Sequence, residues 1–489
     1  MRTWPFPAGD GKHGSGRSGS PKTPEVCVGS SPLALSLLGP SPVGQDVPAA
    51  RPLADVVGAD KVVPLVTGQL ARYANLDYAA STPALRAVAD QVAEVLPVYS
   101  SVHRGAGYNS QVCTAAYEAA RRDVGAFVGA GHDDVVIFTR NTTDALNLLA
   151  RAAGGPVLHL DLEHHANFLP WMGRGGQVIP VQPTLTGTLA AVADALASSA
   201  VALLAVTGAS NVTGECPPVG LLADLAHAHG ARIAVDGAQL VPHRRLDIAA
   251  LGLDYLAFSG HKMYAPFGAG ALIGRRDWLD AAPPYLAGGG AVRSVTAGSV
   301  TWADGPARHE AGTPNVVGAI ALAAACRCLA ALPRDEVREH ESALLDRLAE
   351  GLASVGARVL RAWDDADCLD RVAVASFTVP GYPAALTAAY LSAEHGIGVR
   401  DGKFCAHPLL ARLAPEGDGT AVRASLGLGS RADDVDRLIG ALDLLRRQGP
   451  SWTYGPDHRP QPDPRPLPGW AATSMAGSDP GDGRSPCES

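Results

Sequence analysis

Two residues in this chain combine side-chain types and a spacing that indicate catalysis, Lys262 and Asp236. Lys262 follows a mostly apolar run at residues 253–258, and Asp236 ends another apolar run at residues 233–235. Both runs predict buried strands. Taken singly, a lysine in a strand-to-loop turn and a turn aspartate are ordinary features. The chemistry therefore depends on the motifs around them.

An amine and a carboxylate at the ends of neighbouring strands suit pyridoxal phosphate (PLP). The lysine forms a Schiff base with the cofactor aldehyde, and the carboxylate keeps the pyridine nitrogen protonated, so that the ring can accept electrons from a substrate carbon. We therefore predict PLP as the cofactor, held by Lys262 and Asp236.

Further polar residues follow other predicted strands. Thr142 and Thr143 begin a predicted helix, and the backbone N–H groups at a helix start form an anion site that suits a phosphate, although a plain threonine N-cap has the same pattern. His164 could stack on the ring and move protons, or could be a surface histidine. Asn211 and Gln239 could bind a ring oxygen or a substrate carboxylate, or could serve a turn.

The alternation of short apolar runs and helical patterns predicts an α/β domain. Strands without strict alternation, separated by helices, indicate a largely parallel sheet buried on both faces. Pro180 makes the third strand an edge strand. We expect seven strands, at residues 135–139, 157–160, 178–181, 202–206, 233–235, 255–258 and 271–273. We expect helices at residues 142–153, 190–197, 221–229 and 248–251.

The pattern changes after residue 314, where a smaller α+β domain is expected. Its predicted helices are 315–332, 335–355, 384–395 and 432–446, with strands at 372–379 and 422–426. We accordingly predict a disordered extension at 1–60, a large PLP-binding domain at 61–315 whose first segment contributes to the small domain, the small domain at 316–449 and an irregular Pro-rich tail at 450–489.

Composition narrows the class of protein. The chain has 489 residues, a formal net charge of −8 and 47% hydrophobic residues, which argues against a nucleic-acid or anionic-membrane binder. No apolar run approaches the roughly 18 residues of a membrane helix. Eight cysteines without a CxxC pair indicate reduced thiols, no metal site and a cytoplasmic protein.

Five short motifs together resemble one family. They are LDYAAS at residues 76–81, VHRG at 102–105, VDGAQ at 235–239, SGHK at 259–262 and EAGTPN at 310–315. Their order resembles that of class V PLP enzymes of fold type I, and within them the group II (SufS-like) cysteine desulfurases, which include selenocysteine lyases. The resemblance runs from about residue 73 to 448 and implies the PLP-transferase fold of fold type I.

The resemblance also implies roles for single residues. Lys262 would carry the cofactor, Asp236 would bind the pyridinium and His164 would stack on the ring as an acid/base. Asn211 and Gln239 would contact the ring. These enzymes are homodimers, so Thr313 would reach the phosphate of the neighbouring subunit. The remaining phosphate ligands would be Thr142, Thr143, Ser259 and His261.

Three residues bear on the reaction. Arg423 and Arg400 match the arginines that bind the substrate carboxylate, a role that suits the guanidinium fork. Cys405, five residues after Arg400, matches the nucleophilic cysteine, although a free cysteine is also often a buried apolar filler. Lys403 nearby favours an activated thiol. The family usually has two histidines where this chain has Lys403-Phe404, which bears on how sulfur is handed over.

We therefore predict a PLP-dependent cysteine desulfurase that converts L-cysteine to L-alanine, with a persulfide on Cys405 that passes to a sulfur-acceptor protein. One alternative is another reaction of the same family, a C–S β-lyase, an aminotransferase or an epimerase, on a different amino acid. The other is a non-catalytic protein that kept the fold. Neither alternative requires Cys405.

Overall fold

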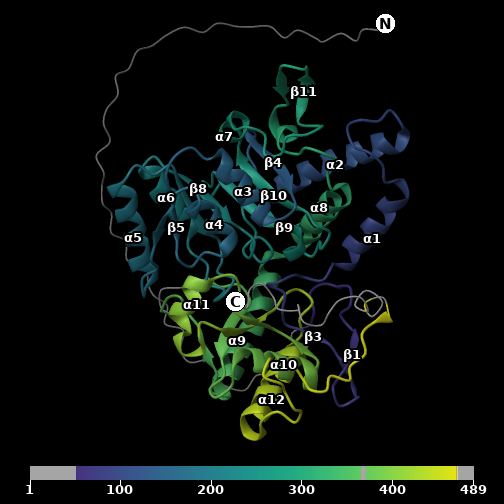
Figure 1. Ribbon diagram of the computed structural model, residues 1–489, viewed down its shortest axis with the longest axis vertical. Helices are drawn as coiled ribbons and strands as arrows, with labels where there is room; N and C mark the ends of the chain where they lie inside the picture. The colour runs from purple at the N-terminus through teal and green to yellow at the C-terminus, as the bar shows by residue number, and fades with distance from the viewer. Residues whose placement is uncertain (1–50, 365–369, 470, 472–489) are drawn as a thin grey trace. The chain divides into compact units, whose positions relative to one another are not determined.

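The computed structural model describes residues 51–364, 370–469 and 471. All of them belong to one unit of the chain, residues 48–489 (Figure 1). Most of the predicted extension, residues 1–50, lies outside the described residues. The rest of it, residues 51–60, packs on the protein: Val56 is buried and bridges Leu85, and the Leu53 N–H donates to the Leu428 carbonyl.

A seven-stranded sheet forms the centre of the larger α/β part (Figure 1). The five strands from β9 to β6 are parallel, and β10 is antiparallel to both of its neighbours, which confirms the mostly parallel sheet. In spatial order the strands are β4 (Asp134–Thr139), β10 (Gly270–Arg275), β9 (Tyr255–Ser259), β8 (Arg232–Asp236), β7 (Leu203–Thr207), β5 (Val157–Leu160) and β6 (Gln177–Ile179). All seven predicted strands are present, and β6, which ends before Pro180, is an edge strand as expected.

Helices cover both faces of this sheet, because alternate side chains of its strands are buried in two separate hydrophobic cores. Leu204 and Val206 of β7 point into one core, whereas Leu203 and Ala205 point into another. The first core is covered by α2 (Tyr108–Phe127), α5 (Leu185–Ser198), α6 (Val219–Ala228) and α8 (Val316–Ala331). The second is covered by α3 (Thr142–Ala152), α4 (Leu169–Met172) and α7 (Arg276–Ala281). Burial on both faces explains why the strands lack polar alternation.

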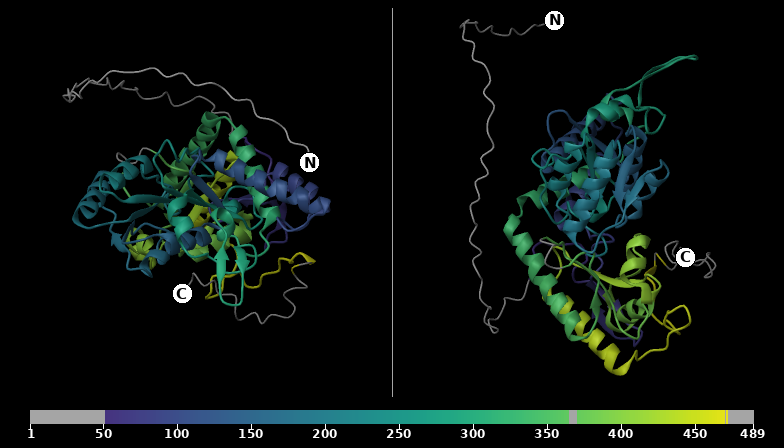
Figure 2. Two further views of the ribbon diagram at one scale, coloured as in Figure 1. Left: turned by 90° about the horizontal axis from the view of Figure 1, so that it is seen from above. Right: turned by 90° about the vertical axis from the view of Figure 1, so that its left-hand side faces the viewer.

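A four-stranded antiparallel sheet forms a second layer. Its strands, in order, are β13 (Arg358–Val359), β14 (Val374–Thr378), β17 (Ala421–Ser425) and β16 (Arg400–Gly402). Its core includes residues of α9 (Arg334–Ser354), α10 (Ala384–His395) and α12 (Ala432–Gln448), and α11 (His407–Leu413) follows β16 (Figure 2). The early strand β3 (Ala74–Asn75) pairs with β15 (Ile397–Gly398), which joins the first described segment to this layer.

Four elements differ from expectation. The predicted helix at 248–251 is only a turn, because Gly252, with a φ of 65°, takes a left-handed conformation that ends it. Two helices, α1 (Arg86–Val95) and α2, had not been predicted. The helix α8, expected in the small domain, instead packs against α1 and α2, since its buried side chains face the core of the large sheet. The proposed boundary at residue 315 stays a prediction.

Two small hairpins complete the described fold. The pair β1 (Val62–Pro64) and β2 (Leu70–Arg72) precedes β3. The pair β11 (Val292–Val295) and β12 (Val300–Trp302) projects from the large layer (Figure 2).

In the described part of the chain no single helix is long and apolar enough to cross a membrane, and only α8 with α9, bent by 90°, meet that test as a pair.

A buried ion pair ties β4 to the EAGTPN motif. Glu310 Oε1 lies 2.6 Å from Arg121 Nη1 and accepts the Phe138 N–H at 2.7 Å. Its other oxygen accepts the Tyr117 hydroxyl at 2.9 Å. Only 7% of the Glu310 side chain and 14% of the Arg121 side chain are exposed. Glu118, which also binds Arg121, is 37% exposed.

We predict that Glu310→Ala lowers the free energy of unfolding by about 3 kcal/mol, because it leaves a buried guanidinium without its main counter-charge. Glu118→Ala is the matched control and should cost under about 1 kcal/mol, since that pair is solvent-screened. Urea unfolding of both variants measures the difference. Equal losses would contradict a structural role for the buried pair.

Candidate active site

The predicted site residues gather around one cavity of about 300 Å³. Several follow the carboxyl ends of the parallel strands β5, β7, β8 and β9, where ligands bind in open α/β sheets. The cavity wall contains Thr142, Thr143, His164, Asn211, Asp236, Gln239, Ser259, His261, Lys262, Arg400, Cys405 and Arg423. Of the predicted residues only Thr313 is not in the wall: it is exposed. A larger cavity of about 800 Å³, lined mostly by apolar residues such as Leu185, contains none of these residues.

Lys262 and Asp236 lie in this wall at the ends of neighbouring strands. Asp236 is the last residue of β8, and Lys262 ends the single 3₁₀ turn, Gly260–Lys262, that follows β9. Burial lowers the pKa of Lys262 to about 8, and the negative charge of Asp236 opposes that shift. Burial also raises the pKa of Asp236, although its carboxylate accepts the Ala238 N–H at 2.9 Å. A pKa of about 8 gives Lys262 a larger neutral fraction near physiological pH than an unperturbed lysine has, and the neutral amine is the form that attacks an aldehyde.

The start of α3 provides an anion cradle. Thr142 and Thr143 are the first two helical residues, and the N-cap is Asn141, whose Oδ1 accepts the Asp144 N–H at 3.0 Å. The alternative of a threonine N-cap is therefore wrong. Ser259 Oγ lies 2.7 Å from both the backbone nitrogen and the hydroxyl of Thr142, which joins β9 to this helix start.

Gly270 brings β10 close to the same cradle. A Cβ atom there would lie 2.7 Å from Asn141 Cα and 2.8 Å from the Phe258 carbonyl oxygen. Both contacts are with backbone, so no side-chain rotation could relieve them. Glycine is required because the strand passes directly beneath the loop that begins the helix.

Two histidines in the wall are neutral at pH 7. Burial lowers the pKa of His164 to about 3 and that of His261 to about 4, and the charge of Lys262 adds to both shifts. His164 Nδ1 accepts the Ala166 N–H at 3.0 Å, so the ring proton lies on Nε2. The neutral ring can stack on an aromatic cofactor and donate a hydrogen bond from that nitrogen.

The amides of Asn211 and Gln239 have protein partners. Asn211 Nδ2 donates to the Phe404 carbonyl, and Gln239 Nε2 donates to the Ala79 carbonyl, each at 2.8 Å. Each side chain is thereby oriented at the cavity wall and keeps its carbonyl oxygen and one N–H for a ligand. Sequence reasoning had placed both residues at the cofactor but had not found these partners.

Two arginines face one another across β16 and β17, because Arg400 and Arg423 are paired residues of these strands. Like charges directly opposite repel, so the pair favours an anion between or beside them. Asp77 provides one: its Oδ1 accepts Arg423 Nη2 at 3.2 Å. Arg423 Nη1 donates to the Asn211 carbonyl at 3.0 Å, and its buried Nε has no hydrogen-bond partner. Part of the guanidinium is therefore available to a carboxylate.

Sequence reasoning missed the role of Asp77. The residue stands in the LDYAAS motif, but its partner Arg423 lies 346 positions later. Burial raises the pKa of Asp77, and the charges of Arg423 and Arg400 oppose that shift. Asp77 is not in the cavity wall, whereas Arg423 is, so Asp77 binds the guanidinium from outside the cavity.

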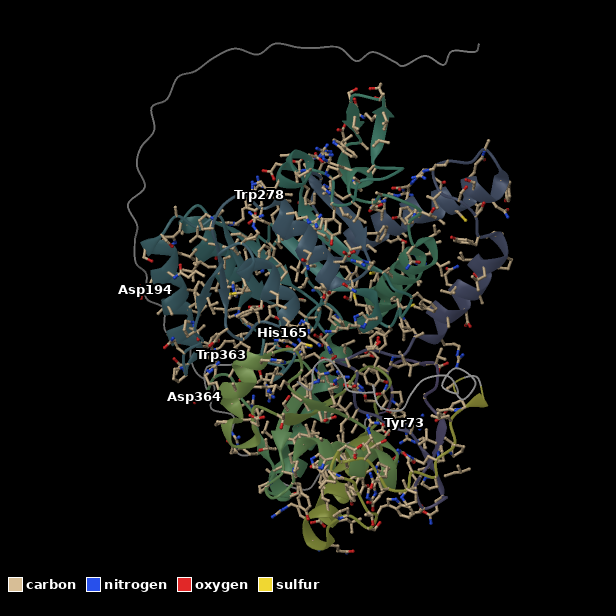
Figure 3. The ribbon with its side chains drawn as sticks, in the orientation of Figure 1. Tyr73, His165, Asp194, Trp278, Trp363 and Asp364 are labelled. Carbon is tan, nitrogen blue, oxygen red and sulfur yellow. The ribbon has the colours of Figure 1, made fainter. Side chains whose placement is uncertain are left out.

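Cys405 lies in the loop between β16 and α11, and its neighbour Phe404 also forms part of the wall. Both have left-handed backbone conformations, with φ of 48° for Phe404 and 53° for Cys405. The Cys405 carbonyl accepts the His165 N–H at 2.8 Å. His165, labelled in Figure 3, also contacts His407 at the start of α11, with ring centroids 4.5 Å apart.

Comparison with known proteins agrees with this geometry. Residues 74–438 match the family model described as aminotransferase class-V. The chain is 37% identical over 398 residues to a cysteine desulfurase of Klebsiella pneumoniae, covering 78% of this chain and 95% of the relative. It is 38% identical over 391 residues to a probable cysteine desulfurase of Halobacterium salinarum, covering 76% and 91%.

Solved structures give the same result. The apo cysteine desulfurase from Thermococcus onnurineus superposes with a TM-score of 0.69 at 31% identity, covering 76% of this chain and 94% of that one. The cysteine desulfurase CsdA of Escherichia coli superposes with a TM-score of 0.67 at 33% identity, with the same coverage. The α/β fold of PLP enzymes predicted from the sequence is thus confirmed. This chain belongs to the class-V aminotransferase family, among relatives that are cysteine desulfurases.

Proposed function

We propose that this protein is a PLP-dependent cysteine desulfurase that converts L-cysteine to L-alanine and keeps the sulfur as a persulfide on Cys405. The supporting observation is that Lys262, Cys405 and Arg423 line one cavity. These three side chains provide an amine for the cofactor, a thiol for the sulfur and a cation for the substrate carboxylate. Relatives named as cysteine desulfurases, at 36–38% identity, support the same reaction.

The residues present fit PLP. The start of α3 with Ser259 suits the phosphate, Lys262 suits the aldehyde, and Asp236 suits the pyridine nitrogen. His164, in the same cavity wall, would cover the ring. When bound, the cofactor supplies an electron sink for the substrate α-carbon.

The chain's own residues would perform the other steps. Arg423, with Arg400, binds the substrate carboxylate and fixes the orientation of the amino acid. The amine of Lys262, neutral above about pH 8, accepts the Cα proton. The Cys405 thiolate then attacks the substrate sulfur, so that an S–S bond forms as the C–S bond breaks. The electron pair of the broken bond stays with the carbon fragment, which takes up protons and leaves as alanine.

Further parts of the proposal concern partners. We propose a homodimer in which Thr313, exposed in the single chain, binds the cofactor phosphate of the partner subunit. We also propose a protein acceptor for the persulfide sulfur and a cytoplasmic setting. The division into a large and a small domain near residue 315 belongs to the same proposal.

The first test is Cys405→Ala. The variant should bind PLP normally but release alanine from L-cysteine about 100-fold more slowly, because the sulfur has lost its acceptor. Alanine and Cys405 persulfide are measured together by chromatography and mass spectrometry. Cys328→Ala is the matched control, because Cys328 lies outside the cavity wall. Unchanged release of sulfide with pyruvate in Cys405→Ala would instead identify a C–S β-lyase.

The second test uses the pKa of Lys262, which burial lowers to about 8. Only the neutral amine attacks the cofactor aldehyde, so the rate constant of PLP attachment should rise about 10-fold per pH unit below pH 8 and level off above it. Borohydride trapping and mass spectrometry of the apo-enzyme mixed with PLP measure the rate. A rate that keeps rising to pH 10 would show an unperturbed lysine and contradict the buried site.

A further inference from the structure

Phe404 occupies a position for which the motifs of the chain assign no role. It is 5% exposed, directly precedes Cys405 and forms part of the cavity wall. Its φ of 48° lies in the left-handed region, which a bulky residue with a Cβ rarely adopts. Cys405 follows with a φ of 53°. Two consecutive non-glycine residues in this region need external contacts to hold them there.

The contacts that hold Phe404 form a closed circuit with Arg423. The Phe404 carbonyl accepts Asn211 Nδ2 at 2.8 Å, and the Asn211 carbonyl accepts Arg423 Nη1 at 3.0 Å. The guanidinium carbon of Arg423 lies 5.1 Å from the centroid of the Phe404 ring, within range for a cation–π contact. Any shift of Arg423 therefore acts on Phe404 through two separate contacts.

The same segment fixes the nucleophile. Cys405 is covalently next to Phe404, and its carbonyl accepts the His165 N–H at 2.8 Å. The Ala406 N–H donates to the Lys403 carbonyl at 2.9 Å, which closes the turn around both residues. The backbone of Cys405 is thus held on one side by His165 and on the other by the ring and carbonyl of Phe404.

We infer that Phe404 is a positioning residue that couples the guanidinium of Arg423 to the placement of the Cys405 thiol. The inference rests on the proposed function, in which Arg423 binds the substrate carboxylate and Cys405 accepts the sulfur. A carboxylate bound to Arg423 restricts the motion of its guanidinium. The guanidinium in turn holds the Phe404 ring in place, and the ring holds the backbone turn that carries the Cys405 thiol. Coupling of this kind is reciprocal, so the state of the turn also changes carboxylate affinity.

The test measures the thiol without turnover. The holoenzyme, free of substrate, is treated with iodoacetamide, and the alkylation rate of the peptide that contains Cys405 is followed by mass spectrometry. We expect Phe404→Leu, which keeps an apolar side chain but removes the ring face, to change this rate about 5-fold or more and to raise KM for L-cysteine by a similar factor. Phe404→Tyr keeps the ring and should retain the wild-type alkylation rate.

A double-mutant cycle with Arg423→Lys isolates the coupling. Arg423→Lys should change the alkylation rate of Cys405 by a larger factor in the wild-type background than in Phe404→Leu, because the ring contact is already lost in that variant and only the path through Asn211 remains. Phe127→Leu, the same substitution at the end of α2 and away from the cavity, should leave both the rate and KM unchanged.

The outcomes separate cleanly. If Phe404→Leu matches the wild type in alkylation rate and KM, or if the two effects simply multiply, the coupling is overturned. If Phe404→Leu does not fold, Arg423→Lys alone decides, since an unchanged alkylation rate in that variant also overturns the coupling. If the wild type releases no alanine from L-cysteine, the proposed function is wrong. The alkylation cycle needs no turnover, so it would still show whether Arg423 and Cys405 are coupled through Phe404.

Discussion

The burial of Lys262 beside Asp236 is the constraint on which the site depends. A charged amine and a carboxylate are both costly to bury, and each shifts its pKa toward the neutral form. The sheet places them at the carboxyl ends of the adjacent parallel strands β8 and β9, where the attraction between their charges offsets part of this cost. Because those strands are buried on both faces, neither side chain can relax into solvent. A perturbed lysine in a cavity is the condition that imine chemistry needs.

The second layer contributes Arg400, Phe404, Cys405 and Arg423 to the cavity wall. Its strands β16 and β17 carry Arg400 and Arg423 opposite one another, and Asp77, from the segment before the large sheet, neutralises part of that charge. The described chain therefore brings together three distant stretches of sequence: Asp77, the wall residues between Thr142 and Lys262, and the segment from Arg400 to Arg423. Precise placement of these groups, rather than strong binding by any one of them, is what accelerates a reaction.

The Lys403-Phe404 pair distinguishes this chain from the two-histidine pattern expected for its family. The ring of Phe404 lies under Arg423, and its carbonyl is held by Asn211. A neutral aromatic residue in this place excludes water from one face of the guanidinium, which strengthens its electrostatic interactions. Beside this loop, His165, whose backbone N–H donates to the Cys405 carbonyl, and His407 form a ring pair from different elements.

The sequence by itself determined the local features of this protein. Apolar runs predicted all seven strands of the large sheet to within a few residues, because a strand buried on both faces must be apolar throughout. The motifs also predicted the cavity residues, most of which lie at or just after the end of a strand, whereas Arg400 and Arg423 lie within strands. The tertiary structure alone decided the contacts between distant segments: Asp77 with Arg423, Phe404 under Arg423, and α8 against α2. These contacts depend on how the layers pack against one another. Hydrophobic periodicity indicates local secondary structure and does not indicate which distant side chains will be in contact.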